Sequence, residues 1–197
     1  MQEHTRGERA RSVEVSVPVG TRVIEGRISG MVASGMVLWR GGNARPRDRV
    51  DTWIKHCVIC ASVLEGESLQ SRLVCTDKAL VFRHFKDAAG YLGLLLEIYD
   101  MGHDEPVPFF PATSLAYCDT LKKQLSASNS DEAKLASAIR TAWAPGRHSP
   151  AKADSDDPYV FRCFGTQPPD GDRFRDLATR ILSPMIGHQS DGERAGA

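Results

Sequence analysis

The sequence lacks the short motifs that accompany most catalytic sites. It contains no glycine-rich phosphate-binding loop, no serine–histidine–aspartate set in a recognisable context, no zinc framework and no internal repeat. The residues therefore give no support to a catalytic function. From the sequence we predict no catalytic residue, no metal site and no cofactor.

The chain also lacks an excess of charge and a long apolar run. Lys and Arg number 25, and so do Asp and Glu. A nucleic-acid partner would therefore depend on local clustering of basic residues rather than on net charge. No apolar run reaches the ~18 residues that span a bilayer, and the first residues are charged, unlike a signal peptide. We expect a cytoplasmic protein that makes no contact with a membrane.

The five cysteines do not form a disulfide or zinc framework. Their number is odd, and each lies inside an apolar segment, which is typical of reduced thiols in a core. The run His56-Cys57-x-x-Cys60 resembles a zinc half-site. It falls inside a helical pattern, however, and no second ligand pair follows at a suitable spacing. We interpret these residues as core packing.

Length and composition favour one globular domain. The chain has 197 residues, of which 41% are hydrophobic and 25% charged, as in ordinary globular proteins. The polar ends predict a disordered lead-in over residues 1–12 and a disordered tail over residues 188–197. A single domain is expected over residues 13–187.

The first third of this domain predicts three antiparallel strands and a helix. Valines alternate with polar residues over Val13–Val19, and Pro18 places this strand at a sheet edge. Gly20-Thr21 turns the chain into a second strand, and Ala33-Ser34-Gly35 turns it into a third. A helix follows, with Asp48 as its cap and a continuous apolar stripe. The stripe comprises Val50, Trp53, Ile54, Cys57, Val58, Ala61 and Leu64, with Gly66 after it and Ile59 on the other side.

Further elements complete an α/β pattern. Two short strands, Leu69–Cys75 and Ala79–Phe85, flank a hairpin turn, and Asp87 opens an apolar helix that we expect to be covered on several sides and closed by Gly102. We predict helices over Ser114–Leu125, after a Ser130 cap, and along a closing stripe; Tyr159–Phe164 reads as a strand or an extended arm. The closing stripe comprises Phe174, Leu177, Ala178, Ile181, Leu182, Met185 and Ile186. The fold class is α/β, with a mixed, mainly antiparallel central sheet and flanking helices.

The order strand, strand, helix is the one in which a large group of nucleases builds its Mg²⁺ site. Such a site needs converging carboxylates and a lysine. Here Ser29 stands where the first aspartate is expected, and neither Leu38 nor Arg40 supplies the acid of the second strand. Glu25 is the one carboxylate nearby. We therefore predict a degenerate nuclease site that binds no metal, with Glu25, Ser29, Val37 and Trp39 on one face.

Two stretches are candidate contact surfaces. Arg40, Arg45 and Arg47 lie in a segment that we expect to be a flexible loop, which is either solvated or contacts phosphates. Phe109 and Phe110 stand between prolines and form either a core anchor or a partner contact. Both alternatives stay open at the level of sequence.

Several stretches taken in series resemble the C-terminal domains of the RecC family, the gamma subunits of exodeoxyribonuclease V. They are G-R-I-S-G-M at Gly26–Met31, G-M-V-L-W-R at Gly35–Arg40, E-P-V-P-F-F-P-A-T-S at Glu105–Ser114, D-D-P-Y at Asp156–Tyr159 and F-R-D-L-A-T-R-I-L-S-P-M from Phe174. Their order and spacing match over about residues 13–187.

The resemblance implies a fold related to the PD-(D/E)xK nucleases that lacks the catalytic residues. It also implies a non-catalytic domain of a helicase–nuclease that repairs double-strand breaks and takes part in recombination. Such a domain guides DNA and docks RecB-like and RecD-like subunits. The neutral overall charge and the clustered Arg40, Arg45 and Arg47 predict that its DNA binding is weak and sequence-independent. Two other classes remain open: an active metal-dependent nuclease and a stand-alone protein-binding module.

Overall fold

The computed structural model describes residues 9–62, 69–144 and 153–192. The chain divides into two compact units. Unit 1 contains Met1–Asp100 and His188–Ala197, and unit 2 contains Met101–Gly187. Folding of residues 13–187 as a single domain stays a prediction. The expected lead-in lies mostly outside the described residues, although its last two positions, Arg11 and Ser12, already belong to the first strand.

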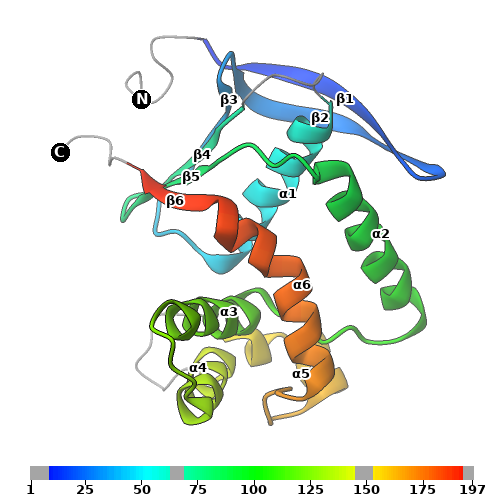
Figure 1. Ribbon diagram of the computed structural model, residues 1–197. Coiled ribbons are helices and arrows are strands. Elements are labelled where there is room, and N and C mark those ends of the chain that lie inside the picture. The colour runs from blue at the N-terminus through cyan, green and yellow to red at the C-terminus, as the bar shows by residue number, and fades with distance from the viewer. Residues whose placement is uncertain (1–8, 63–68, 145–152, 193–197) are drawn as a thin grey trace. The chain divides into compact units, whose positions relative to one another are not determined.

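Unit 1 is built on a six-stranded sheet whose spatial order follows the chain, β1-β2-β3-β4-β5-β6 (Figure 1). All neighbouring strands pair antiparallel except β3 and β4. The prediction of a mixed, mainly antiparallel sheet is confirmed, and so is the position of the first strand at an edge. The strands are β1 (Arg11–Val19), β2 (Arg22–Val32), β3 (Gly35–Trp39), β4 (Ser71–Val74), β5 (Ala79–Phe82) and β6 (Gln189–Gly192).

Two glycines allow β2 and β3 to approach their neighbours closely. Gly30 has φ +80° and Gly35 has φ +136°, a region that side-chain-bearing residues rarely adopt. A Cβ atom on Gly30 would overlap the Val37 carbonyl oxygen, and one on Gly35 would overlap the Gln70 carbonyl oxygen. The predicted glycine turn between the second and third strands is therefore confirmed, and its glycine also makes room for the segment that leads into β4.

Helix α1 (Pro46–Ser62) supplies the centre of the unit 1 core. Trp53, Cys57 and Val58 are buried, as the stripe predicts. Ile54 is exposed, so its place in the stripe is wrong, whereas Ile59 on the other side is buried. Asp48 is not the cap, because it lies inside the first turn and its carboxylate accepts a hydrogen bond from the backbone N–H of Arg45 (3.3 Å). The predicted positions Leu64 and Gly66 lie outside the described residues.

Helix α2 (Ala88–Asp104) begins after Asp87, as predicted, but continues through Gly102. It was expected to be covered on several sides. Its buried residues are Ala88, Tyr91, Leu92 and Ile98, while Tyr99 is exposed. One side of this apolar helix therefore remains accessible.

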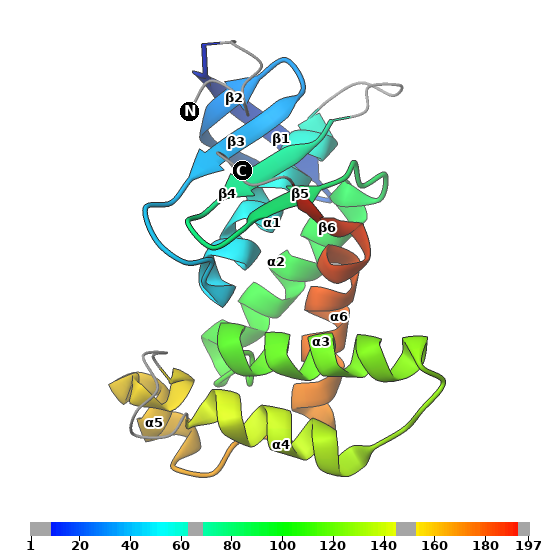
Figure 2. The same cartoon turned by 90° about the vertical axis from the view of Figure 1, so that its left-hand side faces the viewer.

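Unit 2 is helical (Figure 2). The seven residues of the closing stripe are all buried, which confirms that helix. Phe110 and Trp143 lie edge to face with ring centroids 5.0 Å apart, and Phe110 also meets Phe174. An aromatic cluster thus joins the unit 2 helices. The elements are α3 (Pro111–Ser126), α4 (Glu132–Trp143), the short 3₁₀ helix η2 (Asp154–Asp156), α5 (Pro158–Phe164) and α6 (Asp172–His188).

Three expectations about the second half of the chain are wrong. The cap of α4 is Asp131, not Ser130, because the Asp131 carboxylate accepts from the Lys134 N–H (3.0 Å). Tyr159–Phe164 is neither a strand nor an extended arm but belongs to α5. The polar tail is ordered over Gln189–Gly192, which forms β6 beside β5.

Candidate nucleic-acid interface and degenerate metal position

The outward face of the β1–β2 hairpin carries Glu25 and Ser29, two of the residues predicted from the sequence for a degenerate nuclease site. Strand alternation buries Val17 and turns Ser16 and its partner Glu25 outward. The Ser16 hydroxyl donates to the Glu25 carboxylate (3.4 Å), and the hydroxyls of Ser12 and Ser29 are 3.0 Å apart. Each of these two positions thus has a serine hydroxyl as its side-chain hydrogen-bond partner.

A second carboxylate, Glu14, lies on this face and was not among the site residues predicted from the sequence. Glu14 pairs with Arg27 directly across the strands (Nη2–Oε1 2.6 Å), two residues along the same face from the Ser16–Glu25 pair. Strand alternation alone would have placed it beside Glu25. The Arg27 guanidinium opposes a metal ion at this place because it already compensates the Glu14 charge. In the described parts of the chain, no group of three or more His, Cys, Asp or Glu side chains could hold a metal ion.

The structure does not bring the third strand to the same site. Residues of β2 pair with β3 only at Met31 and Val32, well beyond Glu25. Val37 is buried in an apolar cluster with Val32 and Val74, and Trp39 is exposed. Glu25, Ser29, Val37 and Trp39 therefore do not form one exposed face, and Leu38, which is half-buried, supplies no ligand.

Arg40, at the end of β3, is held by local partners. Its Nε atom lies 3.0 Å from the Asp48 carboxylate and donates to the Asn43 carbonyl (2.7 Å). Because Asp48 also accepts from the Arg45 N–H, one carboxylate links the end of β3 to the start of α1. Arg40 therefore stabilises this connection, and its charge is partly compensated.

The segment between β3 and α1 is anchored rather than loose, so the expectation of a flexible loop is wrong. The Ala44 N–H donates to the Asp77 carboxylate (2.7 Å), and the Thr76 N–H donates to the Gly42 carbonyl (3.0 Å). The Thr76 hydroxyl also bonds the Asn43 side chain (3.1 Å). The β4–β5 turn thus fixes the shape of this segment.

Arg45 and Arg47 differ from Arg40 because both are exposed. Arg45 directly precedes α1, and Arg47 lies in its first turn rather than in the loop. Both side chains therefore start from the positive end of a helix dipole, where phosphate is favoured. The next arginine, Arg49, is buried and donates to the Gln189 side chain (3.1 Å). Of the sequence-predicted arginines, Arg45 and Arg47 are the ones presented to solvent.

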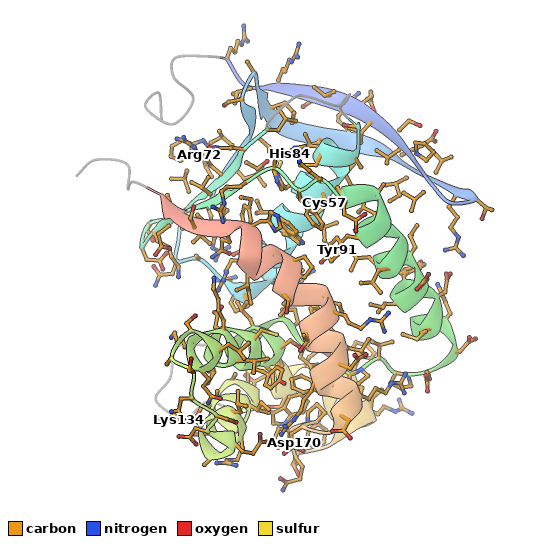
Figure 3. The ribbon with its side chains drawn as sticks, in the orientation of Figure 1. Cys57, Arg72, His84, Tyr91, Lys134 and Asp170 are labelled. Carbon is orange, nitrogen blue, oxygen red and sulfur yellow. The ribbon has the colours of Figure 1, made fainter. Side chains whose placement is uncertain are left out.

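The histidine and cysteines of α1 belong to the core. His56 is buried with both ring nitrogens engaged: Nε2–H donates to the Arg83 carbonyl (2.9 Å), and Nδ1 accepts from the Ser71 hydroxyl (2.8 Å). Burial lowers the pKa of His56 to about 4 and raises the pKa of the Cys57 and Cys60 thiols. Cys57 lies in the interior near Tyr91 of α2 (Figure 3). The geometry supports the core-packing interpretation.

Phe109 and Phe110 have different environments. Phe110 is 3% exposed and packs edge to face on Phe164 (4.9 Å) as well as on Trp143. It is a core anchor of unit 2. Phe109 is half-buried, so of the two it is the one with surface left for a partner, and that role stays a prediction.

Comparison with known proteins gives a family. The model of the RecC C-terminal domain matches residues 1–122, which contain the β1–β5 strands and helices α1 and α2. A search of curated proteins gives no match. Within the described residues, every helix is too short or too polar to cross a membrane. The matched residues make up more than half of the chain, and the chain therefore belongs to the RecC C-terminal domain family.

Proposed function

We propose that this chain is a non-catalytic scaffold domain of a RecC-type subunit in an exodeoxyribonuclease V complex that repairs double-strand breaks. In this role it guides DNA through backbone contacts and docks RecB-like and RecD-like subunits. The observation that carries the proposal is the outward face of β1–β2, where Glu25 has a serine partner and Glu14 is neutralised by Arg27. Family membership supports the setting, a complex with other subunits and DNA.

The order β2, β3, α1 supports descent from the PD-(D/E)xK nucleases. A catalytic version of this frame needs two or more carboxylates converging on one ion. Here Glu25 lies away from the part of β2 that pairs with β3, and the charge at the end of β3 is the cation Arg40. The frame is therefore retained as a scaffold without its chemistry.

Arg45 and Arg47 are the proposed DNA contacts. Arg40 is tied to Asp48 and contributes less. Each arginine that neutralises a duplex phosphate changes the slope of log affinity against log salt by about 0.9. Two contacts, rather than three, therefore predict a contribution of about 1.8 to the slope.

A forked duplex with the full chain tests this proposal. We expect the Arg45→Ala/Arg47→Ala variant to bind more weakly and to reduce the salt slope by about 1.8. A matched control, Arg140→Ala/Arg180→Ala, removes the same charge from exposed positions on α4 and α6 and should leave the slope nearly unchanged. Equal effects of the two variants would show that binding depends on total charge rather than on one surface, and the assignment to Arg45 and Arg47 would be wrong.

A metal-dependent nuclease is the second candidate, favoured by the presence of Glu14 and Glu25 on one face. The assay is incubation of the chain with linear DNA and Mg²⁺ or Mn²⁺, beside Glu25→Ala and Glu14→Gln variants. The scaffold role predicts no cleavage by any of them. Cleavage by the unaltered chain that disappears in Glu25→Ala would refute the non-catalytic assignment.

A further inference from the structure

Strand β1 forms one edge of the unit 1 sheet (Figure 1). Among the residues that the structure describes, β1 pairs only with β2, and no other backbone hydrogen bond reaches it. The nine residues of β1 therefore leave a row of backbone N–H and C=O groups unpaired on their outer side. An open edge of this length is a template on which another extended chain can pair.

The hairpin turn decides which backbone groups point outward. Val19 pairs with Arg22 across the two-residue turn Gly20-Thr21, so these two residues exchange the closing hydrogen bonds of the hairpin. Hydrogen-bonded pairs recur at every second residue. The odd-numbered residues of β1 therefore bond β2, and the even-numbered ones direct their N–H and C=O groups to the open side. Pro18, which has no N–H, occupies one of these outward positions.

The side chains of β1 leave this edge accessible. Sheet edges are commonly protected by lysine, proline or a bulge. Strand β1 has Pro18 near one end and a register shift between Arg11 and Val13 at the other, which leaves Val13–Val17 unprotected. The polar side chains here are directed to β2 rather than across the edge, because each bonds a β2 residue: Ser12 bonds Ser29, Glu14 bonds Arg27 and Ser16 bonds Glu25.

The inner side of the same stretch is incompletely covered. Val17 is 1% exposed, whereas Val13 and Val15 are half-buried. An added strand with apolar residues at alternate positions would cover both. Strand β1 itself has this pattern, since its valines alternate with polar residues.

We propose that β1 pairs antiparallel with β1 of a second copy of this chain, with Val15 opposite its own counterpart. In this register Glu14 of one copy lies opposite Ser16 of the other, and the outward N–H groups of both residues each meet a carbonyl. Val13 lies opposite Val17 of the second copy, which extends the apolar cover of the inner face. The register with Glu14 opposite its own counterpart is disfavoured, because it sets two carboxylates side by side.

The charges and the sheet topology suit a second copy as the occupant. Basic and acidic residues number 25 each, so two copies do not repel one another through net charge. At the edge itself Arg27 compensates the charge of Glu14. The pairing is closed, because each copy uses its β1 edge once and the opposite edge of the sheet, β6, takes no part. A dimer is therefore expected, and this inference does not rest on the proposed function.

Sedimentation equilibrium and hydrogen exchange of the full chain test the pairing. We expect a monomer–dimer equilibrium with no larger species. The amides of Glu14 and Ser16, which are open in the monomer, should exchange about tenfold or more slowly in the dimer. The amides of Val15 and Val17 bond β2 and should exchange slowly in both states. This alternation along β1 is a signature that association through another surface would not produce.

A proline substitution removes one outward donor. Ser16→Pro leaves the hydrogen bonds to β2 in place, since Pro18 already occupies an equivalent position. Ser16→Ala is the matched control, because it also loses the bond to Glu25 but keeps the N–H. We expect Ser16→Pro to raise the dissociation constant of the dimer about tenfold or more, and Ser16→Ala to leave it nearly unchanged. The exchange pattern of the unaltered chain decides the question even if Ser16→Pro does not fold.

Three results would overturn the pairing. The first is a chain that stays monomeric at its highest soluble concentration. The second is a dimer in which the Glu14 and Ser16 amides keep their monomer exchange rates. The third is protection of these amides only in a complex with other subunits, which would assign the edge to a strand of a different protein. None of these results bears on the proposed DNA contacts at Arg45 and Arg47.

Discussion

His56 gives the sharpest test of how unit 1 is held together. It is 0% exposed and joins α1 to the Ser71 hydroxyl of β4 and to the Arg83 carbonyl after β5. Its ring also packs 5.6 Å from the Trp53 ring. Replacing His56 by alanine removes the two hydrogen bonds through which this residue joins the central helix α1 to the sheet.

The expected cost follows from the groups left behind. His56→Ala removes one hydrogen bond from the Ser71 hydroxyl and one from the Arg83 carbonyl, and each such bond contributes about 0.5–1.5 kcal/mol to stability. Loss of the packed ring adds a cavity. We therefore expect His56→Ala to lower the free energy of unfolding by about 3–5 kcal/mol. Ser71→Ala removes only the hydrogen bond between the Ser71 hydroxyl and Nδ1 of His56 and should cost about 1–2 kcal/mol.

The same residue predicts a pH dependence. Burial holds the pKa of His56 at about 4 in the folded chain, against its ordinary 6.5. Between these values the unfolded chain binds a proton that the folded chain does not, so stability falls as the pH drops from 6.5 to 4. The contribution of neutral His56 to the free energy of unfolding is therefore fully present above pH 6.5. Below pH 4 this contribution is lost, which lowers the free energy of unfolding by about 3 kcal/mol.

Hydrogen exchange of α1 peptides in the full chain measures the opening free energy of this region directly. We expect this opening free energy, corrected for intrinsic exchange, to decrease between pH 7 and pH 5 in the unaltered chain. The decrease should be smaller in His56→Gln. NMR titration of the His56 ring gives the pKa itself. A measured His56 pKa near 6.5 would refute the argument, because a buried imidazole that stays neutral cannot have the pKa of a solvated one.

Two further changes test unit 2 and the β2–β3 connection. Asp154→Ala removes the acceptor for the Thr113 N–H and hydroxyl and should destabilise unit 2 by about 1–2 kcal/mol in urea unfolding. Asp176→Ala, which removes only an exposed ion pair with Arg180, should cost less than about 0.5 kcal/mol. Similar effects of the two variants would contradict the role of Asp154 as the acceptor that holds Thr113. Gly35→Ala places a Cβ against the Gln70 carbonyl at φ +136° and should cost about 2 kcal/mol or more by thermal unfolding. Gly41→Ala, with nothing within 4 Å of its Cβ, is the matched control, and equal melting temperatures for the two would rule out the close approach.

The elements that the sequence predicts well are those in which hydrophobic period and turn chemistry agree. The alternation of valines, together with Pro18, predicts the edge strand β1, and the closing apolar stripe predicts helix α6. Helix α5 was missed because Tyr, Val and Phe favour strands. Its signal was nevertheless present, since Asp157 followed by Pro158 is a helix start.

The candidate site was predictable in part. The shortage of carboxylates in β2 and β3 is visible from the sequence, and alternation would also have found Glu14. The pairing of Arg40 with Asp48 depends on where α1 begins, and α1 begins earlier than the expected Asp48 cap. The anchoring of the arginine segment depends on the β4–β5 turn, which meets it only in the folded sheet.

Strand β6 is short and polar, and it joins the sheet by backbone pairing with β5. It pairs Gln189 with Phe82, so one edge of the unit 1 sheet comes from the far end of the chain. Such a pairing has a high contact order and forms late in folding. During synthesis on the ribosome, the β5 edge of the sheet therefore stays unpaired until unit 2 and then β6 have been synthesised. A fragment that stops at residue 122 would keep that edge permanently open to pairing with other chains.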